Sequence, residues 1–581
     1  MFTNQTRKEL TEQAIEILWT GFGDFCEAFA TITQRAGRRF EQRDWQGMRR
    51  DTVERLDLYP GIVAETVSLL KRALAPGVCA HAIWSDIKLQ FRHVCSDKCD
   101  AEIASTFYNS VHRKLFAKMG VDPELTFLTP PDPSLSASHQ KQFFELEVND
   151  LKPEDVHAIL SYYAFQTPFE NMEEDVRQCA IRIAELGGSA DARRRSIRIQ
   201  MLKVPFYRGM SAYLVGRMHL DGIQRPLVFV LDNESKGLRV DALLTTSEQL
   251  RVLFSFSRAY FHVRTSCPGA IVDFLRPLMP EKRIAEIYIG LGYHKHGKTE
   301  LYKDLLKHQR VCSQDRFDFS PGKHGMVMIA FSMPDDDLIY KLIRDRFGTP
   351  KHTTAKQVME KYDYVFKHDR AGRLLDVQTF ENLELEECCF TPELLYKIKS
   401  EATRAASVQN GRVRLHHAYV ERRVTPLDLY LQQADADAAE AVIMDYGRAI
   451  KDLARINVFP GDMLTKNFGV TRLGRVVFYD YDELCPLLDC NFRKLPQARQ
   501  YEDELNAEPW FFVDEHDVFP EEFTAFLGLS PPLREVFLKN HGNLLEPEFW
   551  QQTQARIRAG VLSHIRPYKE AQRLERKDRG D

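Results

Sequence analysis

Three polar side chains in the last quarter of the chain have the types and spacing needed to hold a metal ion and a phosphate. In FPGDMLTKNFGV, Asp462 is followed five positions later by Asn467, and Asp480 comes thirteen residues after Asn467, at the end of the apolar run VVFY. Phosphoryl transfer needs hard oxygen ligands for Mg²⁺ and a carboxylate near the nucleophile. The pattern predicts Asn467 and Asp480 as metal ligands and Asp462 as that carboxylate. Lys466 could contact the transferred phosphoryl group.

Residues further upstream could supply the contacts to a nucleotide. The segment SPGKHGM places two glycines in a short turn before the apolar run MVMIAF, and such turns let the backbone approach phosphates. Lys341 lies among apolar neighbours in the predicted strand LIYKLI, as does the lysine that pairs with the α- and β-phosphates in kinases. Glu360, on a helix predicted for 353–365, is a candidate partner for Lys341. The predicted ATP contacts are Ser320, Pro321, Gly322, Lys323, His324, Gly325, Met326 and Lys341.

Protein kinases contain these parts in the same order, from glycine turn and strand lysine to the Asp-x-x-x-x-Asn loop and a later metal-binding Asp. Here the last tripeptide is Asp-Tyr-Asp (480–482) rather than Asp-Phe-Gly, and 421–433 fits a hinge between lobes. Each part is common alone, but the ordered series favours a kinase-like site. The alternative is a kinase-fold binding or scaffold protein without phosphate transfer. The intact set of Lys341, Asp462, Asn467 and Asp480 argues against it.

A rival nucleotide site is GYHKHGKT, residues 292–299, which satisfies the phosphate-loop pattern G-x-x-x-x-G-K-[ST]. A functional phosphate loop follows a buried strand, whereas the preceding EKRIAEIYIGL predicts a helix. We therefore predict that this segment is a basic, solvated loop that does not bind the catalytic nucleotide. His294 and His296, spaced H-x-H, lack a carboxylate or Cys partner at a ligand-like distance and are expected to face solvent.

The periodicity of apolar residues predicts the elements around these sites. Residues 5–120 have helical spacing, 200–265 contain short β-like runs such as 212–220, 226–233 and 252–263, and helix returns at 271–291. A proline-rich break at 129–140 predicts a linker. After about residue 310 the pattern changes to strands, and a long helix at 435–457 precedes the Asp462 loop. The pattern changes and the length of 581 residues predict two domains or more.

The composition is that of an ordinary globular protein, with 44% hydrophobic residues, 28% charged residues and a net charge of −4. This balance gives no general attraction to nucleic acid or to an anionic membrane. No apolar run is long enough to span a bilayer, and the polar N-terminus lacks a signal-peptide core. The eleven cysteines form no zinc pattern, and we expect reduced thiols and an intracellular protein. The charged residues 570–581 are expected to be a frayed end.

The chain resembles bacterial isocitrate dehydrogenase kinase/phosphatases over nearly its whole length, and four stretches show the resemblance best. They are VPFYRGMSAYLVGR (204–217), SPGKHGMVM (320–328), HDRAGRLLDVQTFENL (368–383) and, most specific, NVFPGDMLTKNFGVTRLGRVVFYDYDE (457–483). The resemblance implies an α+β fold. A mainly helical N-terminal regulatory domain with a small β-containing segment would span 1–310. A bilobed protein-kinase-like domain would span 311–581, with an N-lobe at about 311–420 and a C-lobe at about 421–581.

The resemblance also implies an activity. Members phosphorylate a serine of isocitrate dehydrogenase and remove that phosphate again, which controls flux between the citric acid cycle and the glyoxylate bypass. Such an enzyme would use ATP and Mg²⁺, with Mn²⁺ as a substitute, respond to AMP as an allosteric effector, act in the cytoplasm and could form a homodimer. The motif match makes Asp462 the kinase carboxylate and Asp376 the residue that the phosphatase requires. From the residues alone, Asp376 between Leu375 and Val377 is only an edge position.

Overall fold

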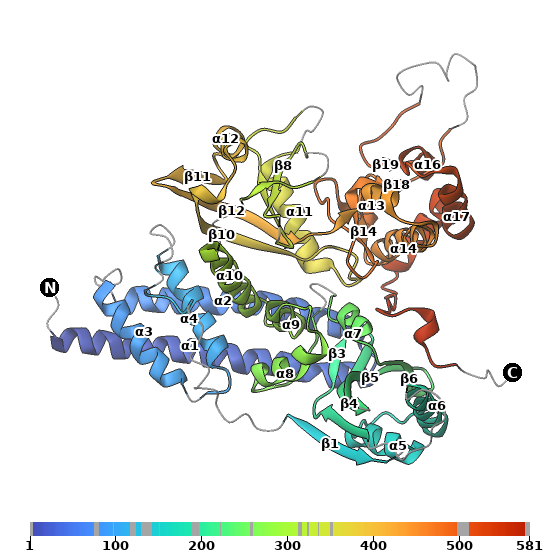
Figure 1. The fold of residues 1–581 in the computed structure, drawn as a ribbon, viewed down its shortest axis with the longest axis horizontal. Coiled ribbons are helices and arrows are strands. Elements are labelled where there is room, and N and C mark those ends of the chain that lie inside the picture. Colours follow the sequence, from blue (N-terminus) through green and yellow to red (C-terminus); the bar gives the residue numbers. More distant parts are fainter. Residues whose placement is uncertain are drawn as a thin grey trace. The chain divides into compact units, whose positions relative to one another are not determined.

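The computed structural model describes two compact units, unit 1 with residues 1–308 and 566–581, and unit 2 with residues 309–565 (Figure 1). The predicted α+β class is confirmed, because helices and antiparallel sheets occur in both units. The structure describes the chain apart from residues 1–3, 75–80, 97, 117–121, 123, 129–141, 150, 187–196, 221, 256–259, 312–315, 322–324, 335, 349–352, 497–510 and 576–581. The predicted linker at 129–140 lies outside the described residues.

Unit 1 begins with the predicted helices. Apolar side chains at helical spacing in the first helix, such as Leu18, Phe22, Phe25 and Phe29, are buried in one cluster with residues of the next three helices. The two longest helices run side by side (Figure 1). These four helices are α1 (Asn4–Glu41), α2 (Trp45–Ala73), α3 (His81–Cys95) and α4 (Ala101–Leu115).

A six-stranded antiparallel sheet forms the rest of unit 1, in the order β1-β2-β4-β5-β6 with β3 paired to β4. Both faces are covered: Val228 and Val230 of β5 join the cluster of α1–α4, whereas Leu227 and Phe229 pack with α5 and α6. The strands are β1 (Phe143–Val148), β2 (Ile197–Leu202), β3 (Phe206–Arg208), β4 (Ser211–Leu220), β5 (Ile223–Glu234) and β6 (Gly237–Leu244); the helices are α5 (Pro153–Tyr162), α6 (Met172–Glu185), α7 (Ser247–Leu253), α8 (Pro268–Leu275), α9 (Ile284–Gly290) and α10 (His294–Val311).

The β-like prediction for 252–263 is wrong. Helix α7 ends at Leu253, and among the described residues after it only His262 forms an isolated bridge, with Tyr207. The apolar side chains of this segment are nevertheless buried, as Phe254 and Phe261 are. A short apolar run between turns fits a buried irregular segment as well as a buried strand.

Residues 566–575, the last described part of the chain, pack against the sheet of unit 1, so the prediction of a frayed end is wrong for residues 570–575, and residues 576–581 lie outside the described residues. Arg566 forms an ion pair of 2.8 Å with the buried Asp232, and Arg573 forms one of 2.9 Å with the buried Asp241. The Tyr568 hydroxyl donates a hydrogen bond of 2.6 Å to Asp241. The sequence prediction failed because the partners of these arginines lie more than 300 positions earlier, as the separation of 327 between Tyr568 and Asp241 shows.

The prediction that all cysteines are reduced is also wrong. Cys99 and Cys267 form a disulfide, and they are 168 positions apart in the sequence. It joins the residue before the N-cap of α4 to the N-cap of α8. The other described cysteines have free thiols. Sequence spacing could not indicate this bond, because only the fold brings Cys99 and Cys267 together.

Unit 2 divides into a sheet-rich part and a mainly helical part. Its six-stranded antiparallel sheet has the order β10-β12-β9-β8-β7, with β11 paired to β12. The sheet-rich part comprises β7 (Asp318–Phe319), β8 (Met328–Ser332), β9 (Leu338–Ile343), α11 (Ala355–His368), β10 (Val377–Glu386), α12 (Pro392–Glu401), β11 (Ala406–Gln409) and β12 (Arg412–Arg422).

The helical part of unit 2 is built around α14, whose residues Ile443, Tyr446, Ile450 and Leu453 are buried in one cluster with the loops and short strands that follow. Its main elements are β13 (Thr425–Pro426), α13 (Leu427–Gln433), α14 (Ala436–Arg455), β14 (Val458–Phe459), β15 (Phe468–Val470), β16 (Val476–Phe478), β17 (Cys485–Pro486), β18 (Asn491–Phe492), β19 (Asp517–Val518), α16 (Phe523–Phe526), α17 (Pro531–His541) and α18 (Pro547–Arg558). None of the described helices is long and apolar enough to cross a membrane.

Candidate active site

Lys341 lies on β9, at the centre of the sheet of unit 2. Its Nζ forms an ion pair of 2.7 Å with Oε1 of Glu421, on the neighbouring strand β12. Both side chains are buried, with 11% and 2% of their surface exposed. Burial raises the pKa of Glu421, and the charge of Lys341 acts against that rise. Lys341 also donates a hydrogen bond of 3.2 Å to the carbonyl of Tyr479, which links the sheet to the Asp480 segment.

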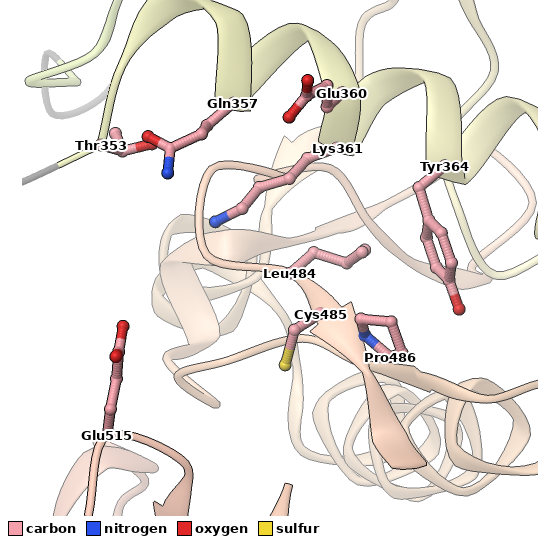
Figure 2. A pocket seen from close by; sticks show the side chains of 9 residues that line it. All are labelled: Thr353, Gln357, Glu360, Lys361, Tyr364, Leu484, Cys485, Pro486 and Glu515. Atoms are coloured by element: carbon pink, nitrogen blue, oxygen red, sulfur yellow. The ribbon is translucent and has the colours of Figure 1, made fainter. Parts of the chain in front are cut away.

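Glu360 is not the partner of Lys341. Its side chain is 60% exposed on α11 and lies 3.7 Å from Lys356 of the same helix. It lines a cavity with Gln357 and Lys361 (Figure 2). The sequence placed Glu360 on the helix where kinases carry this glutamate, but it could not reveal that β12 puts Glu421 within reach of the lysine. The register pairs Glu421 with Ile339, two positions from Lys341.

The predicted phosphate-binding turn connects β7 to β8. The N–H of Ser320 donates a 3.0 Å hydrogen bond to the carbonyl of Ala330, and β8 begins at Met328. Pro321, Gly325 and Met326 lie in this connection, and Met326 is exposed. The predicted contacts Gly322, Lys323 and His324 lie outside the described residues.

The Asp462 loop follows the short strand β14. Gly461 has a φ of +84°, and a Cβ there would lie 2.8 Å from Cβ of Glu483, so this position favours glycine. The amide nitrogen of Asn467 donates a hydrogen bond to Oδ1 of Asp462, which leaves the amide oxygen available for a cation. Lys466 is exposed, and its carbonyl accepts a hydrogen bond from the Tyr479 hydroxyl. These contacts bring Asp462 and Asn467 together and hold the loop against the Asp480 segment.

Asp480 lies two residues past β16, which ends at Phe478. Burial and the negative charge of Asp482 raise the pKa of Asp480 to about 8, while Lys341 lowers it and Asp462 adds to the rise. The carboxylates of Asp462, Asp480 and Asp482 therefore lie close together, and the single positive charge of Lys341 does not neutralise them all. Three carboxylates and an amide oxygen form a hard oxygen donor set, so these residues fit a bound Mg²⁺.

The segment that precedes Asp376 is fixed by a buried arginine that sequence reasoning missed. Arg373 forms ion pairs of 2.7 Å with Asp445 and 3.0 Å with Asp452, both on α14, and donates a 3.1 Å hydrogen bond to the carbonyl of Val476. The position of Arg373 directly before the apolar Leu374 and Leu375 was the available signal, because a buried arginine needs carboxylate partners.

Asp376 lies beside the chain that leads to Asp480. The N–H of Leu375 donates a 3.0 Å hydrogen bond to the carbonyl of Phe478, and the Tyr481 hydroxyl donates one of 2.8 Å to the carbonyl of Leu375. The Asp376 carboxylate accepts hydrogen bonds of 3.1 and 3.2 Å from Gln378. Asp376 and the predicted metal ligand Asp480 thus belong to neighbouring, hydrogen-bonded segments.

The phosphate-loop motif is helical in the structure, and the prediction of a solvated loop there is wrong in detail. Helix α10 begins at His294, and the N–H of Gly297 already donates to the carbonyl of Tyr293. His296 is buried and hydrogen-bonded to Thr106 at 2.7 Å, because the first turn of α10 packs into unit 1. The segment has no free glycine-rich loop and does not form a phosphate loop.

The fold and site of unit 2 define a protein-kinase-like protein. An antiparallel sheet carries a buried lysine–glutamate pair, a hinge-like stretch from β12 to α13 follows, and the helical part contributes the Asp462–Asn467 loop and Asp480.

The comparisons with known proteins support this protein class and cover residues 15–570. Residues 15–314 match the family model of the isocitrate dehydrogenase kinase/phosphatase (AceK) regulatory domain, and residues 315–570 match that of the AceK kinase domain. The chain therefore belongs to the isocitrate dehydrogenase kinase/phosphatase family. A kinase domain implies use of ATP and, typically, a divalent metal.

Three curated relatives carry this name. A protein of Anaeromyxobacter sp. (strain Fw109-5), named isocitrate dehydrogenase kinase/phosphatase, is 42% identical over 95% of this chain and 96% of its own length. One of Anaeromyxobacter dehalogenans (strain 2CP-C) with the same name is 43% identical over 98% of each chain. The isocitrate dehydrogenase kinase/phosphatase 2 of Pseudoalteromonas translucida is 38% identical over 96% of this chain and 98% of its own.

Proposed function

We propose that this chain is an ATP-dependent protein serine kinase that phosphorylates isocitrate dehydrogenase and also removes the phosphate, and thereby controls flux into the glyoxylate bypass. The observation that carries the proposal is the convergence of Lys341, Asp462, Asn467 and Asp480 in one oxygen-rich, partly buried site. The substrate follows from the names of the relatives, which cover nearly the whole chain.

In the kinase reaction, each residue would have one role. Lys341, held by Glu421, would contact the α- and β-phosphates of ATP, and the β7–β8 connection from Ser320 to Met326 would cover the phosphates. Asn467 and Asp480 would hold Mg²⁺, which neutralises phosphate charge when bound. Asp462 would accept the proton of the substrate serine as its oxygen attacks the γ-phosphorus and ADP leaves, with exposed Lys466 near the transferred group.

For the phosphatase reaction, we assign Asp376 to the positioning of water. The hydrogen bonds between Leu375, Phe478 and Tyr481 support this role, because they keep Asp376 beside the segment of Asp480. A carboxylate there could accept a proton from the attacking water while the serine oxygen of the phosphoprotein leaves.

The remaining parts of the proposal rest on family membership. They are a regulatory domain that ends near residue 310 before a catalytic domain, AMP as an allosteric effector, Mg²⁺ with Mn²⁺ as a substitute, a homodimer and a cytoplasmic location. Because Cys99 and Cys267 form a disulfide, reduced thiols no longer support the cytoplasmic location.

The test follows labelled phosphate from ATP to purified isocitrate dehydrogenase and then its release. Asp462→Ala should abolish transfer, because no other residue in the proposal accepts the serine proton. Asp376→Ala should abolish release but retain part of the transfer, and Glu360→Ala is the matched control on the exposed face of α11. A wild-type chain that binds ATP but labels nothing would favour the scaffold alternative. Equal loss of transfer and release in Asp376→Ala would refute its separate role.

A further inference from the structure

Two cysteine thiols in unit 2 lie in near contact on either side of a short turn. The Sγ atoms of Cys485 and Cys490 are 3.6 Å apart, and the 3-10 turn Leu487–Asp489 lies between them. A disulfide bond is about 2.05 Å long, so the two sulfurs are within about 1.5 Å of bonding distance. The turn is well tied down: Gln554 donates hydrogen bonds to the carbonyls of Leu487 and Cys490 at 2.7 and 2.8 Å.

Cys485 is reachable from a cavity, whereas Cys490 is buried. Cys485 is half-buried and lines a cavity of about 450 Å³ together with Lys361 and Tyr364 of α11. Figure 2 shows Cys485 and Pro486 across the cavity from α11. A cavity of this volume admits a small oxidant, which would therefore meet Cys485 first.

The surroundings of the two thiols favour reaction of Cys485 before Cys490. The hydrogen bond with Cys490 lowers the pKa of Cys485, burial opposes this effect, and the charge of Lys361 adds to it while Asp489 acts against it. The same hydrogen bond and burial raise the pKa of Cys490. Because the thiolate is the nucleophile, Cys485 is the more reactive of the two.

We propose that Cys485 and Cys490 form a hydroperoxide-sensitive dithiol that closes to a disulfide. The Cys485 thiolate attacks one oxygen of a hydroperoxide, the O–O bond breaks, and an alcohol or water leaves with a proton, which makes Cys485 a sulfenic acid. The Cys490 sulfur then attacks the Cys485 sulfur. The S–O bond breaks, and the hydroxyl group leaves as water with the Cys490 proton. Each sulfur is oxidised by one electron, and one hydroperoxide is reduced.

The position of the pair connects this chemistry to the catalytic loop. Cys485 of β17 is paired with Phe459 of β14, and Asp462 follows Phe459 by three residues. Since Gln554 holds the Cys490 end, bond formation should displace Cys485 and disturb its pairing with Phe459. Misplacement of a catalytic group by about 1 Å can cost about 100-fold in rate. Only this consequence for activity rests on the proposed function; the disulfide itself does not.

The experiment treats the full-length chain with a small excess of hydrogen peroxide, blocks remaining thiols by alkylation and maps the peptides by mass spectrometry. We expect a Cys485–Cys490 disulfide in the wild type, reversed by a dithiol reductant. The Cys99–Cys267 disulfide, present before peroxide is added, is the internal standard. Cys490→Ser should accumulate sulfenic acid at Cys485, trapped by dimedone, and Cys485→Ser should form neither product.

Cys388 provides the control, because it is an exposed free thiol of unit 2 that lies beside Glu386 and Cys389 and belongs to a different part of the unit from the Cys485–Cys490 pair. Cys388→Ser should form the Cys485–Cys490 disulfide as fast as the wild type. Faster oxidation of Cys388 than of Cys485, or an unoxidised Cys485 in the wild type, would overturn the proposal; the wild-type measurement does not depend on whether a variant folds. Oxidation should lower phosphate transfer by about tenfold or more in the wild type, and not in Cys490→Ser. Unchanged transfer by the fully oxidised wild type would refute the link to Asp462.

Discussion

Replacement of Glu421 by glutamine should weaken both the fold of unit 2 and its use of ATP. The Glu421 carboxylate is 2.7 Å from Nζ of Lys341, and the two side chains are only 2% and 11% exposed. Removal of one member of a buried ion pair costs about 3–5 kcal/mol, because the other charge stays buried without its partner. Glutamine keeps an acceptor for Lys341, so we expect a loss of about 1.5–3 kcal/mol, typical of a hydrogen bond to a charged group.

The assay has two readouts. At about 2–4 °C per kcal/mol for a domain of this size, the expected loss lowers the melting temperature of unit 2 by about 3–12 °C. Steady-state phosphorylation of isocitrate dehydrogenase, measured well below that temperature, should show kcat/KM for ATP reduced by about 10–100-fold, equivalent to about 1.4–2.7 kcal/mol of transition-state stabilisation. The reason is that the neutral amide of glutamine would hold Lys341 more weakly than the carboxylate does, so Lys341 would be less firmly positioned for the phosphates.

Glu360→Gln is the matched control, since it makes the same chemical change on α11. Glu360 is 60% exposed and pairs with Lys356 at 3.7 Å, an interaction worth about 0.3–0.5 kcal/mol. Its melting temperature and kcat/KM should stay close to those of the wild type. If Glu360→Gln lost activity and Glu421→Gln kept it, Lys341 would pair with α11 in the working enzyme, and the role assigned to Glu421 would be refuted.

Three further predictions concern Asp480, the end of the chain and α10. The pKa of Asp480 is raised from 3.8 to about 8, so the stability that its protonated form contributes is complete below about pH 4 and is lost as the pH rises to about 8. Thermal melts should show this loss of stability in the wild type and not in Asp480→Asn. Binding of Mg²⁺ with an unreactive ATP analogue should make the loss smaller. Asp241→Asn should lower the free energy of unfolding of unit 1 by about 3–5 kcal/mol, since Arg566 and Arg573 lose a buried partner; equal urea denaturation curves would contradict this. Gly297→Ala should destabilise the chain by about 1–3 kcal/mol, because its Cβ would lie 2.5 Å from the carbonyl oxygen of Ala285, whereas Lys298→Ala should leave the KM for ATP unchanged.

The sequence predicted those features that depend on local patterns. The helix of Ala436–Arg455, the strand of Lys341 and the Asp462–Asn467 loop each carry their own periodicity or spacing, and the structure contains all three. Because the order of such elements along the chain is specific to a fold class, the kinase-like arrangement could be inferred before the geometry was known.

The features that sequence analysis missed are contacts between distant residues. The Lys341–Glu421 pair depends on the register of β9 against β12, Arg373 depends on two carboxylates of α14, and the disulfide of Cys99 depends on a residue 168 positions away. Each of these side chains looks like an ordinary polar residue in the sequence. Burial turns them into positions where a missing partner costs several kcal/mol, and burial is a property of the whole fold.

The two glycine-containing segments differ in the element that contains them. In α10, the N–H of Gly297 donates to Tyr293 at 2.9 Å, and the Thr299 hydroxyl donates to the carbonyl of Lys295, so helix hydrogen bonds occupy the donors that a phosphate loop would need. In unit 2, SPGKHGM lies between β7 and β8, and its first residue, Ser320, donates to the carbonyl of Ala330, while residues 322–324 lie outside the described part of the chain. A phosphate-binding motif works through backbone donors, so the element that contains it decides its function. On this ground the degenerate SPGKHGM is the better candidate for ATP, although GYHKHGKT is the segment that satisfies the phosphate-loop pattern.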